Sequence, residues 1–462
     1  MATHLDLEEQ EQLDQLKAFW KQYGNLVTWA LIAVLAAFAA WNGWNWWQRD
    51  QSVKAGAMFD ELESAAGTGD AERAARVFAD MKSRFPRTAF TQEVQLLSDK
   101  SGPLQWTLGA FYYDAVNQIP NYTLGANTIV STAKSNSIAG YGQATYAITP
   151  GTKLTLGARY TNEKSSIDGV VLSGGAPRPG TQGHDSQTFN ELTWRAALDQ
   201  QLTTNAMVYA SVSRGFNAGF FNVSSFGGFA NRTQNPPVLP EYLTAYEIGA
   251  KTDFLDHHLR VNVSGYIYNY RNLVQSVFTS GSVSSINAAA ANIKGIDFEI
   301  VARPIPSLTL SLDGSYIDGH YGSYPNAPNY ILLPTSEVIL PIGAQAFDAA
   351  GNKIVNAPDW TYTFTVSHTL KTSVGRFDTT GNLSYRGKSF VDPGNRIVLP
   401  TRYVVNLTER WTASNSHLFT ELWVKNLFDK RYDNGVAIVV PLGLVGSPAP
   451  PRTYGVTVGV SF

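Results

Sequence analysis

The feature that most limits the fold is an apolar–polar alternation with a period of two, which begins at Thr91 and continues to Phe462. In Lys153–Thr161 and Ser307–Tyr316, leucine and tyrosine alternate mainly with threonine, serine and other polar residues. This period is typical of β-strands whose two faces meet different surroundings. The polar partners are mostly small and neutral. That favours a water-filled lumen over the charged exterior of a soluble sandwich, although alternation alone fits both.

Connections between the expected strands alternate between short and long. Short breaks are expected at 99–102, 149–152, 201–205, 255–258, 304–306, 371–375 and 413–416. Long stretches rich in Gly, Pro, Asn and Ser lie near 115–136, 166–187, 215–243, 272–292, 319–359, 388–402 and 428–452. Structureless loops beyond about 15 residues are uncommon in compact domains, whereas outer-membrane barrels have tight turns at one end and long loops at the other. We therefore predict a mainly β fold, a transmembrane antiparallel β-barrel over residues 91–462.

The composition agrees with a membrane barrel and argues against other classes of protein. Charged residues make up 16% of the chain, against about 25% in soluble domains. The mean hydropathy of −0.14 is too low for a helical membrane protein. A net charge of −2 without a basic cluster gives no reason to expect nucleic acid. The absence of cysteine excludes a disulfide scaffold, a thiolate metal site and a cysteine nucleophile.

Residues 1–90 follow a different pattern, with an acidic tail over 1–24 and an apolar run over 25–47. About 22 apolar residues in a helix would extend about 33 Å, enough to cross a bilayer. Its end carries an aromatic belt, as expected at a membrane interface: Trp41, Trp44, Trp46 and Trp47. The alternatives are a cleaved signal peptide or a buried soluble helix, but the acidic start and bulky exit favour an uncleaved membrane helix. Basic residues flank both ends, so charge does not determine its orientation.

Residues 48–90 are predicted to form a short helical hairpin, one unit of a helical repeat that needs neighbours to bury its face. Four segments carry a resemblance to the YfgM family: EEQEQLDQLKAFWKQYGN (8–25), WNGWNWWQRD (41–50), KAGAMFDELESA (54–65) and RVFADMKSRFPRT (76–88). The resemblance implies an inner-membrane anchor with a periplasmic helical-repeat array and an ancillary role at the secretion translocon. It ends near residue 90, after one repeat unit.

Residues 91–462 resemble the C-terminal barrel part of TonB-dependent outer-membrane receptors. The motifs that carry the resemblance are TQEVQLLSD (91–99), PLQWTLGAFYYD (103–114), VYASVSRGFNAGFFN (208–222), PEYLTAYEIGAKTDFLDHHLRVNVSGYIYNYRN (240–272), IKGIDFEI (293–300), NAPDWTYTF (356–364), LWVKNLFDKRY (422–432) and PRTYGVTVGVSF (451–462). The resemblance implies uptake of a scarce large solute such as a ferric siderophore, driven by the TonB–ExbB–ExbD complex through a plug.

The chain departs from that pattern because no plug or TonB box is visible before residue 91. It also supplies about 15 strands where the family has about 22. The barrel is therefore expected to be incomplete and non-functional alone.

The chain ends in a strand whose apolar positions recur at period two: Tyr454, Val458, Val460 and Phe462. This ending resembles the signal read by the outer-membrane assembly machinery. The alternative is an ordinary amphipathic last strand that ends on an aromatic residue.

Leu259–Arg271 is the stretch that could contact a solute. Alternation predicts that Leu259, Val261, Val263 and Ile267 face lipid. The residues predicted to face the lumen are Arg260, Asn262, Ser264, Tyr266, Tyr268 and Tyr270. The expected ligand path consists of Arg260, Tyr266, Tyr268 and Tyr270, because aromatic rings and a cation suit a planar or anionic chelate. A tyrosine girdle with mixed facing is the alternative.

No catalytic constellation is visible, so we expect no enzyme activity, no cofactor and no metal site. His257 and His258 fall at a predicted short turn and are interpreted as solvated turn residues. Glu241 and Glu247 are interpreted as ordinary strand polar groups rather than an acid/base pair.

Three functions therefore compete: an outer-membrane receptor barrel, an inner-membrane-anchored interaction protein of YfgM type, and a passive pore. The expected barrel places the chain in the outer membrane of a Gram-negative cell, whereas the expected helix suggests the inner membrane. This conflict motivates the hypothesis that the chain is a fusion of two truncated genes with neither activity.

Overall fold

The computed structural model describes residues 89–99, 102–279, 282–332, 339–341, 347–414, 418–439 and 443–460. The chain divides into two compact units, Met1–Thr88 and Ala89–Phe462, and every described residue belongs to the second. The predicted tail, the membrane helix with Trp41, Trp44, Trp46 and Trp47, and the hairpin as far as residue 88 lie outside the described residues. Residues 89 and 90, assigned to the hairpin from sequence, instead begin a strand. In the part of the chain that is described, no helix is long and apolar enough to span a bilayer.

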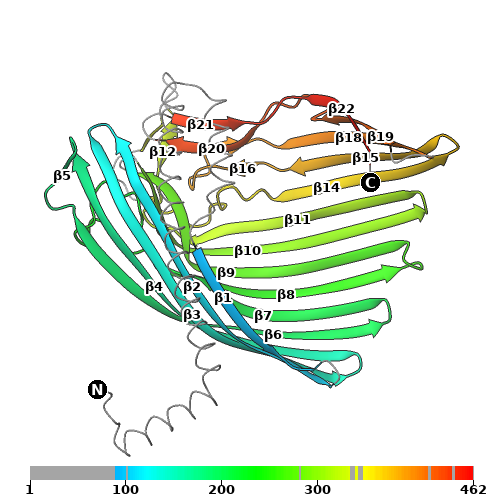
Figure 1. Ribbon diagram of the computed structural model, residues 1–462, viewed down its shortest axis with the longest axis horizontal. Coiled ribbons are helices and arrows are strands. Elements are labelled where there is room, and N and C mark those ends of the chain that lie inside the picture. The colour runs from blue at the N-terminus through cyan, green and yellow to red at the C-terminus, as the bar shows by residue number, and fades with distance from the viewer. Residues whose placement is uncertain are drawn as a thin grey trace, which may run out of the picture. The chain divides into compact units, whose positions relative to one another are not determined.

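The second unit is built from β-strands (Figure 1). The main sheet contains β1 (Ala89–Leu97), β2 (Leu104–Leu124), β3 (Asn127–Thr149), β4 (Thr152–Ser173), β5 (Ala176–Pro177), β6 (Gly183–Thr203), β7 (Ala206–Asn217), β8 (Glu241–Phe254), β9 (Leu259–Thr279), β10 (Ser282–Ile305), β11 (Leu308–Ser323), β14 (Trp360–Thr372), β15 (Gly375–Arg386), β18 (Arg402–Ala413), β19 (Leu418–Lys425) and β22 (Thr453–Val460). Three small hairpins lie in the connections: β12 (Tyr330–Leu332) with β13 (Ile339–Pro341), β16 (Ser389–Phe390) with β17 (Val398–Leu399), and β20 (Asp433–Val439) with β21 (Gly443–Pro448).

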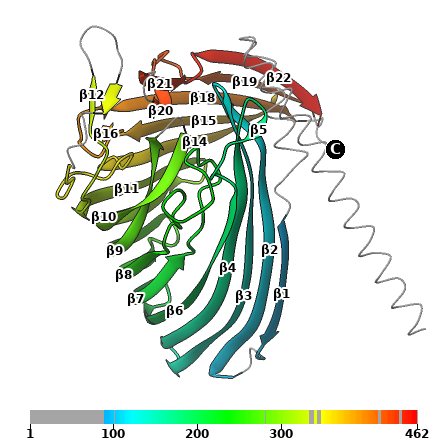
Figure 2. The same cartoon turned by 90° about the vertical axis from the view of Figure 1, so that its left-hand side faces the viewer.

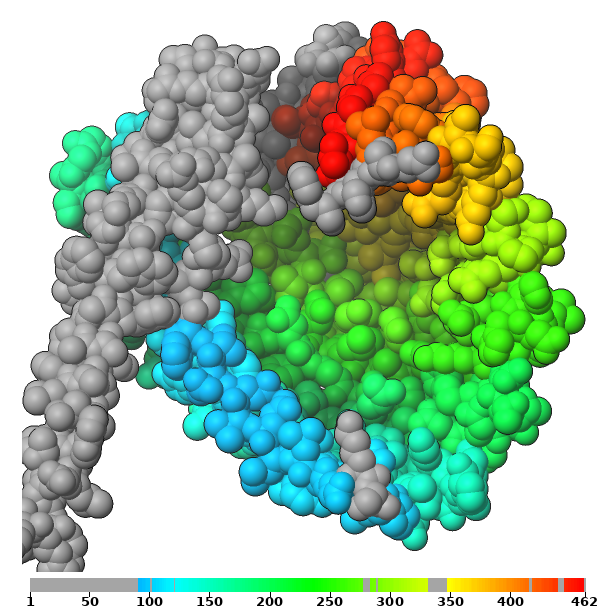
Figure 3. Space-filling view, turned by 45° about the vertical axis from the view of Figure 1, so that its right-hand side comes forward, coloured from blue at the N-terminus to red at the C-terminus, as the bar shows by residue number. Residues whose placement is uncertain are grey.

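The main sheet has 16 strands, and 15 of them follow one another in chain order because β5 pairs only with β4. Neighbouring strands are antiparallel throughout this order, as in the β1–β2 and β19–β22 pairs. The sheet curves around a hollow that Figure 3 shows on its concave side, with β1 and β22 at the two borders. The predicted mainly β, antiparallel architecture of about 15 strands is confirmed.

The two faces of the sheet differ in chemistry, as the period of two requires. One face, here called the apolar face, carries exposed large hydrophobic side chains such as Ile248, Val263, Ile267 and Ile296. Val263 and Ile267 were predicted on this face. The other face, here called the polar face, carries hydrogen-bonded polar pairs such as Asn262 with Glu299, whose side chains lie 2.8 Å apart.

Aromatic side chains form a band across the apolar face, towards the end with the long connections. Each stands on a different strand and is 37–55% exposed: Tyr112, Tyr160, Trp194, Tyr246, Trp360 and Tyr403. Tyrosine and tryptophan collect where a membrane meets water, because their rings are apolar and their tips are polar. The band therefore separates the part of the sheet suited to lipid from the part suited to water.

Short turns occur within two residues of the predicted breaks, for example between β3 and β4 and between β8 and β9. Three predicted long loops are instead continuations of strands. β2 and β3 are joined by a turn at residues 125–126, and the pairs β4 with β6 and β9 with β10 also extend far beyond the aromatic band. The prediction of irregular structure near 115–136, 166–187 and 272–292 was therefore wrong over most of those ranges. Two antiparallel strands satisfy each other's backbone groups, so a polar sequence can remain extended in water.

Glu409 is a charged residue on the otherwise hydrophobic apolar face, and it provides a test of whether that face contacts lipid. Its register partners are Thr379 and Leu422, and Thr379 donates a hydrogen bond of 2.6 Å to its carboxylate. If the face meets lipid, Glu409→Leu removes the cost of a charge in hydrocarbon. We expect it to raise the free energy of unfolding by about 1–2 kcal/mol, measured in lipid vesicles by denaturant titration. The matched control is Glu421→Leu on the polar face, where no gain is expected; equal gains at both positions would contradict the assignment of faces.

Candidate functional site: the polar face and its inward connections

Three of the four residues predicted for a ligand path lie together on β9. The rings of Tyr266 and Tyr268 stack, with centroids 4.4 Å apart and an interplanar angle of 23°. Tyr270 continues the row and packs against a buried cluster that includes Tyr321 and Tyr324. Tyr266 is nearly enclosed, with 9% of its surface exposed. The row therefore runs from the middle of the wall towards the long connections.

Arg260, the fourth residue, lies at the opposite end of β9, beside the short turn. Its guanidinium is 3.4 Å from the Asp253 carboxylate, which also lies 2.9 Å from Nδ1 of His257. His258 instead contacts the carbonyl of Arg303, at 2.7 Å from its Nδ1. The structure therefore does not bring Arg260 together with the tyrosines. Among the described residues, no group of three or more His, Cys, Asp or Glu side chains could hold a metal ion.

The position of Tyr266 depends on a glycine in the neighbouring strand. Tyr266 is the register partner of Gly295 on β10, and its ring covers that glycine so closely that a Cβ there would overlap it. Tyr209 on β7 covers Gly249 on β8 in the same way. Such aromatic–glycine pairs fill the space that glycine leaves and hold the ring flat against the wall.

Glu247, which the sequence identifies only as a strand polar group, lies beside the tyrosine row. The Tyr209 hydroxyl donates a hydrogen bond of 2.5 Å to Glu247, whose register partner on β9 is Tyr266. Glu241 has a different partner, because it accepts a hydrogen bond of 2.6 Å from the backbone N–H of Val274. The two carboxylates therefore do not form an acid/base pair. The link between Tyr209 and Glu247 depends on cross-strand register, which alternation within single strands does not reveal.

The connection between β7 and β8 folds inside the curve of the sheet (Figure 2). Phe221 and Phe229 from this connection form a buried cluster with Ile129, Ile167 and Val171, which lie on β3 and β4. On the other side, Asn222 bonds the backbone of Ser285 on β10, with its amide nitrogen 3.0 Å from the carbonyl and its amide oxygen 2.7 Å from the N–H. The connection therefore spans the hollow between two distant parts of the wall.

A charge pair fixes the tip of the same connection to β6. Arg232 contacts both carboxylate oxygens of Asp185, at 2.8 and 3.1 Å. Burial of Asp185 opposes its ionisation, but the Arg232 side chain and the Ser186 N–H hydrogen-bond the carboxylate and hold its pKa below the usual value. This pair lies beyond Trp194 of the aromatic band, so it stands on the water side.

The described part of the connection between β11 and β14 packs against the polar face of the sheet. Tyr321 and Tyr324 are each 1% exposed and pack with Ala327, Ala349 and Ile354. Burial raises the pKa of the Tyr324 hydroxyl well above its usual value, so it stays protonated. Because Tyr270 packs against this cluster, the inward connection and the tyrosine row form one continuous surface.

These features describe a hollow with a polar and aromatic wall, narrowed at one end by inward-folded connections. Stacked rings offer an apolar, planar contact surface, and the neighbouring hydroxyl and carboxylate groups offer hydrogen bonds. Such a wall suits a large solute that has both flat and polar parts. The predicted assembly signal lies elsewhere: Tyr454, Val458 and Val460 are exposed on the apolar face of β22, and Phe462 lies outside the described residues.

The chain is similar to known receptors over most of its described length. The TonB dependent receptor-like, beta-barrel family matches residues 19–427. A ferric-pyoverdine 358 receptor of Pseudomonas putida is 25% identical over 364 residues, which cover 76% of this chain and 38% of that receptor. The probable TonB-dependent siderophore receptor PiuA of Acinetobacter baumannii is 22% identical over 295 residues, 62% of this chain and 36% of PiuA.

Solved structures agree on the fold. The ferric yersiniabactin uptake receptor FyuA of Yersinia pestis matches with a TM-score of 0.67 at 17% identity, over 81% of this chain and 54% of FyuA. The chain spans about half of that structure and less than half of the two curated relatives. These matches are to receptors and not to enzymes, and the YfgM family is not among them. The family match covers most of the sequence, and so the chain belongs to the TonB-dependent receptor-like β-barrel family.

Proposed function

We propose that residues 89–462 form the wall of an outer-membrane receptor that takes up a scarce, large solute, with a ferric siderophore as the best-supported class. The observation that carries the proposal is the sheet itself, with one apolar face bearing an aromatic band and one polar face covered by inward connections. The relatives support the solute class, because two of them are named as receptors for siderophores or their ferric complexes.

In this proposal Tyr268, which stacks on the nearly enclosed ring of Tyr266, provides the stacking platform for the solute, and Tyr270 links that platform to the connection above it. Arg260 would act at the short-turn end, on a solute that has already passed the tyrosines. Coupling to the TonB–ExbB–ExbD complex is proposed for the whole receptor, since this chain spans only part of its relatives. The ending of β22 with Phe462 is proposed to be read by the outer-membrane assembly machinery.

Residues 1–88 are the basis of two alternatives. The chain is then either an inner-membrane-anchored interaction protein or a fused product with neither activity. Only the resemblance seen in the sequence supports them, since those residues lie outside the described ones and the receptor-family match includes residues 19–88. Membrane fractionation of the full chain separates the two proposals. Outer-membrane recovery with heat-modifiable gel migration supports the receptor wall, and recovery with the inner membrane supports the anchor.

The tyrosine platform predicts a specific effect on binding. We expect Tyr268→Ala to weaken binding of ferric pyoverdine or ferric yersiniabactin, used as probes, by about 3- to 10-fold, since a stacked aromatic contributes about 0.5–1.5 kcal/mol. Binding is measured on outer membranes with radiolabelled iron. Tyr246→Ala is the matched control, because Tyr246 stands on the apolar face. A loss at Tyr246 and none at Tyr268 would remove the platform.

A further inference from the structure

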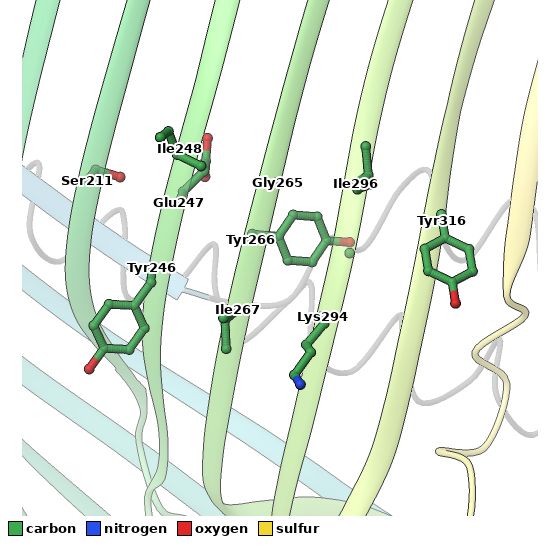
Figure 4. Close-up of a pocket in the computed structure, with 11 residues that line it drawn as sticks. Ser211, Tyr246, Glu247, Ile248, Gly265, Tyr266, Ile267, Lys294, Ile296 and Tyr316 are labelled. Carbon is green, nitrogen blue, oxygen red and sulfur yellow. The ribbon is translucent and has the colours of Figure 1, made fainter.

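A shallow depression of about 500 Å³ lies on the outer wall, where Gly265 of β9 leaves the apolar face without a side chain (Figure 4). The register partners of Gly265 are Ile248 on β8 and Ile296 on β10. The other residues that line the depression from the apolar face are Tyr246, Ile267, Lys294 and Tyr316. This volume falls within the range of about 300–1,000 Å³ that is usual for small-ligand sites.

The two ends of the depression differ, because one is lined by isoleucines and the other by polar-tipped side chains on either side of Ile267. β8 and β10 both run from the side of the long connections to a short turn. Tyr246 therefore lies nearer the long connections than Ile248, and Lys294 lies nearer them than Ile296. Figure 4 shows the Tyr246 and Tyr316 hydroxyls and the Lys294 amino group directed towards the same end. This order, with apolar groups nearer the short turns and polar tips nearer the long connections, matches the order of an acyl chain and its headgroup in a membrane leaflet.

The ammonium group of Lys294 forms no close ion pair with a described residue, although an acidic residue on the next strand is its register partner. Its cross-strand neighbours are Ile267 and Asp318. Asp318 is engaged by His320, whose Nε2 lies 2.8 Å from the carboxylate. Among the described residues, the Lys294 ammonium forms no ion pair within 4 Å. A lysine on an apolar face, at the level of the aromatic band, is costly unless it meets a counter-charge at the interface.

We propose that this depression binds one phosphate-bearing anionic membrane lipid. One acyl chain lies over Gly265 between Ile248 and Ile296, and the phosphate accepts hydrogen bonds from Lys294 and from the Tyr246 or Tyr316 hydroxyl. The inference rests on the proposed function, in that the apolar face must meet a membrane. A zwitterionic lipid of the same chain length fits the apolar part but gains less from the ammonium group.

Two substitutions separate the two halves of the site. Lys294→Gln removes the charge and leaves the depression open. Gly265→Leu fills the depression; the nearest atom to a new Cβ is the Gly295 carbonyl oxygen at 3.9 Å, so the backbone admits a Cβ without a clash. Gly140→Leu is the matched control on the same face, because a Cβ there meets nothing within 4 Å. Lys251→Gln removes a lysine from the polar face, where its Nζ lies 5.9 Å from the Tyr209 ring.

The experiment is native mass spectrometry of the full chain in detergent with dioleoyl phosphatidylglycerol or dioleoyl phosphatidylcholine. We expect the unmodified chain to retain one phosphatidylglycerol with about fivefold preference, Lys294→Gln to lose the preference, and Gly265→Leu to lose retention of both lipids. The controls should match the unmodified chain. Retained preference in Lys294→Gln, or unchanged retention in Gly265→Leu, overturns the site.

Each variant is checked for heat-modifiable migration, and Gly265→Ala supplies a smaller filling if the leucine variant does not fold. An intermediate loss in Gly265→Ala supports the site, and full retention there overturns it. Failure of the lipid site leaves outer-membrane recovery intact, whereas failure of the receptor proposal removes that recovery. The two failures are therefore distinguishable.

Discussion

Replacing Asn426 with alanine is expected to lower the free energy of unfolding of the sheet by about 2–4 kcal/mol. Asn426 follows the last residue of β19 and is 5% exposed. Its side-chain oxygen accepts a hydrogen bond of 2.8 Å from the Lys430 N–H. Its side-chain nitrogen donates to the carbonyls of Lys430, at 3.0 Å, and Pro450, at 3.3 Å. Alanine would leave these three backbone groups without their partner in a nearly closed site.

The backbone of Asn426 adds a second cost, because its φ of 53° lies in the left-handed region. Asparagine tolerates this conformation better than alanine does. Asn426→Gly separates the two contributions, since glycine keeps the backbone conformation and loses only the hydrogen bonds. We therefore expect the glycine variant to be less destabilised than the alanine variant. Denaturant titration in lipid vesicles measures both.

Asn136→Ala provides the control for these asparagine variants. Asn136 is exposed, and its amide hydrogen-bonds the Tyr112 hydroxyl at 2.9 Å. Its loss should change the free energy of unfolding by less than about 0.5 kcal/mol. Equal destabilisation by Asn136→Ala and Asn426→Ala would show that the network around Asn426 does not hold the last two strands together.

The strands and tight turns could be predicted from sequence because they depend on local chemistry. Alternation reports the two faces directly, and turn-forming residues interrupt it at 149–152 and 255–258. The continuation of β2 and β3 beyond the aromatic band could not be predicted in the same way. Beyond that level both faces meet water, so the alternation weakens while the cross-strand hydrogen bonds persist.

The candidate site could be predicted only in part. Tyr266 and Tyr268 share a face because they are two residues apart on one strand, and sequence alone shows this. The contact of Tyr209 with Glu247 depends on the pairing of β7 with β8, and the inward fold of Phe221 and Phe229 depends on packing between distant segments. Alternation places Arg260 on the same face as the tyrosines because it lies an even number of residues from them. Sharing a face, however, carries no information on distance along a strand.

The direction of the two edge strands leads to the second prediction. β1 starts at Ala89, opposite Ala115 of β2 and on the side of the long connections, and ends at Leu97 beside a short turn. β22 starts at Thr453 after a long connection and ends at Val460, level with the short turn between β18 and β19. The two edges therefore run in the same direction. Direct contact between them would be a parallel pair in a sheet that is otherwise antiparallel.

We expect no such closure in the chain by itself. The sequence has no cysteine, so Gln95→Cys on β1 combined with Thr457→Cys on β22 introduces the only two thiols. A disulfide needs Cα atoms within about 7 Å, and these edges should stay farther apart, giving less than about a tenth of the cross-linking seen in a paired control. The control is Glu421→Cys with Thr457→Cys, which are register partners on β19 and β22. Oxidation followed by non-reducing electrophoresis measures the cross-linked fraction in both.

Efficient cross-linking of Gln95→Cys with Thr457→Cys would show that the sheet closes on itself as a small, parallel-sealed barrel, which would favour the passive pore. Without it, each edge presents unpaired backbone groups that cost several kcal/mol apiece in lipid. Strands other than those of residues 89–460 must then pair with both edges. Each of those partners must run from the short-turn end towards the long connections to be antiparallel to β1 and to β22, so an uninterrupted antiparallel closure requires an odd number of additional strands.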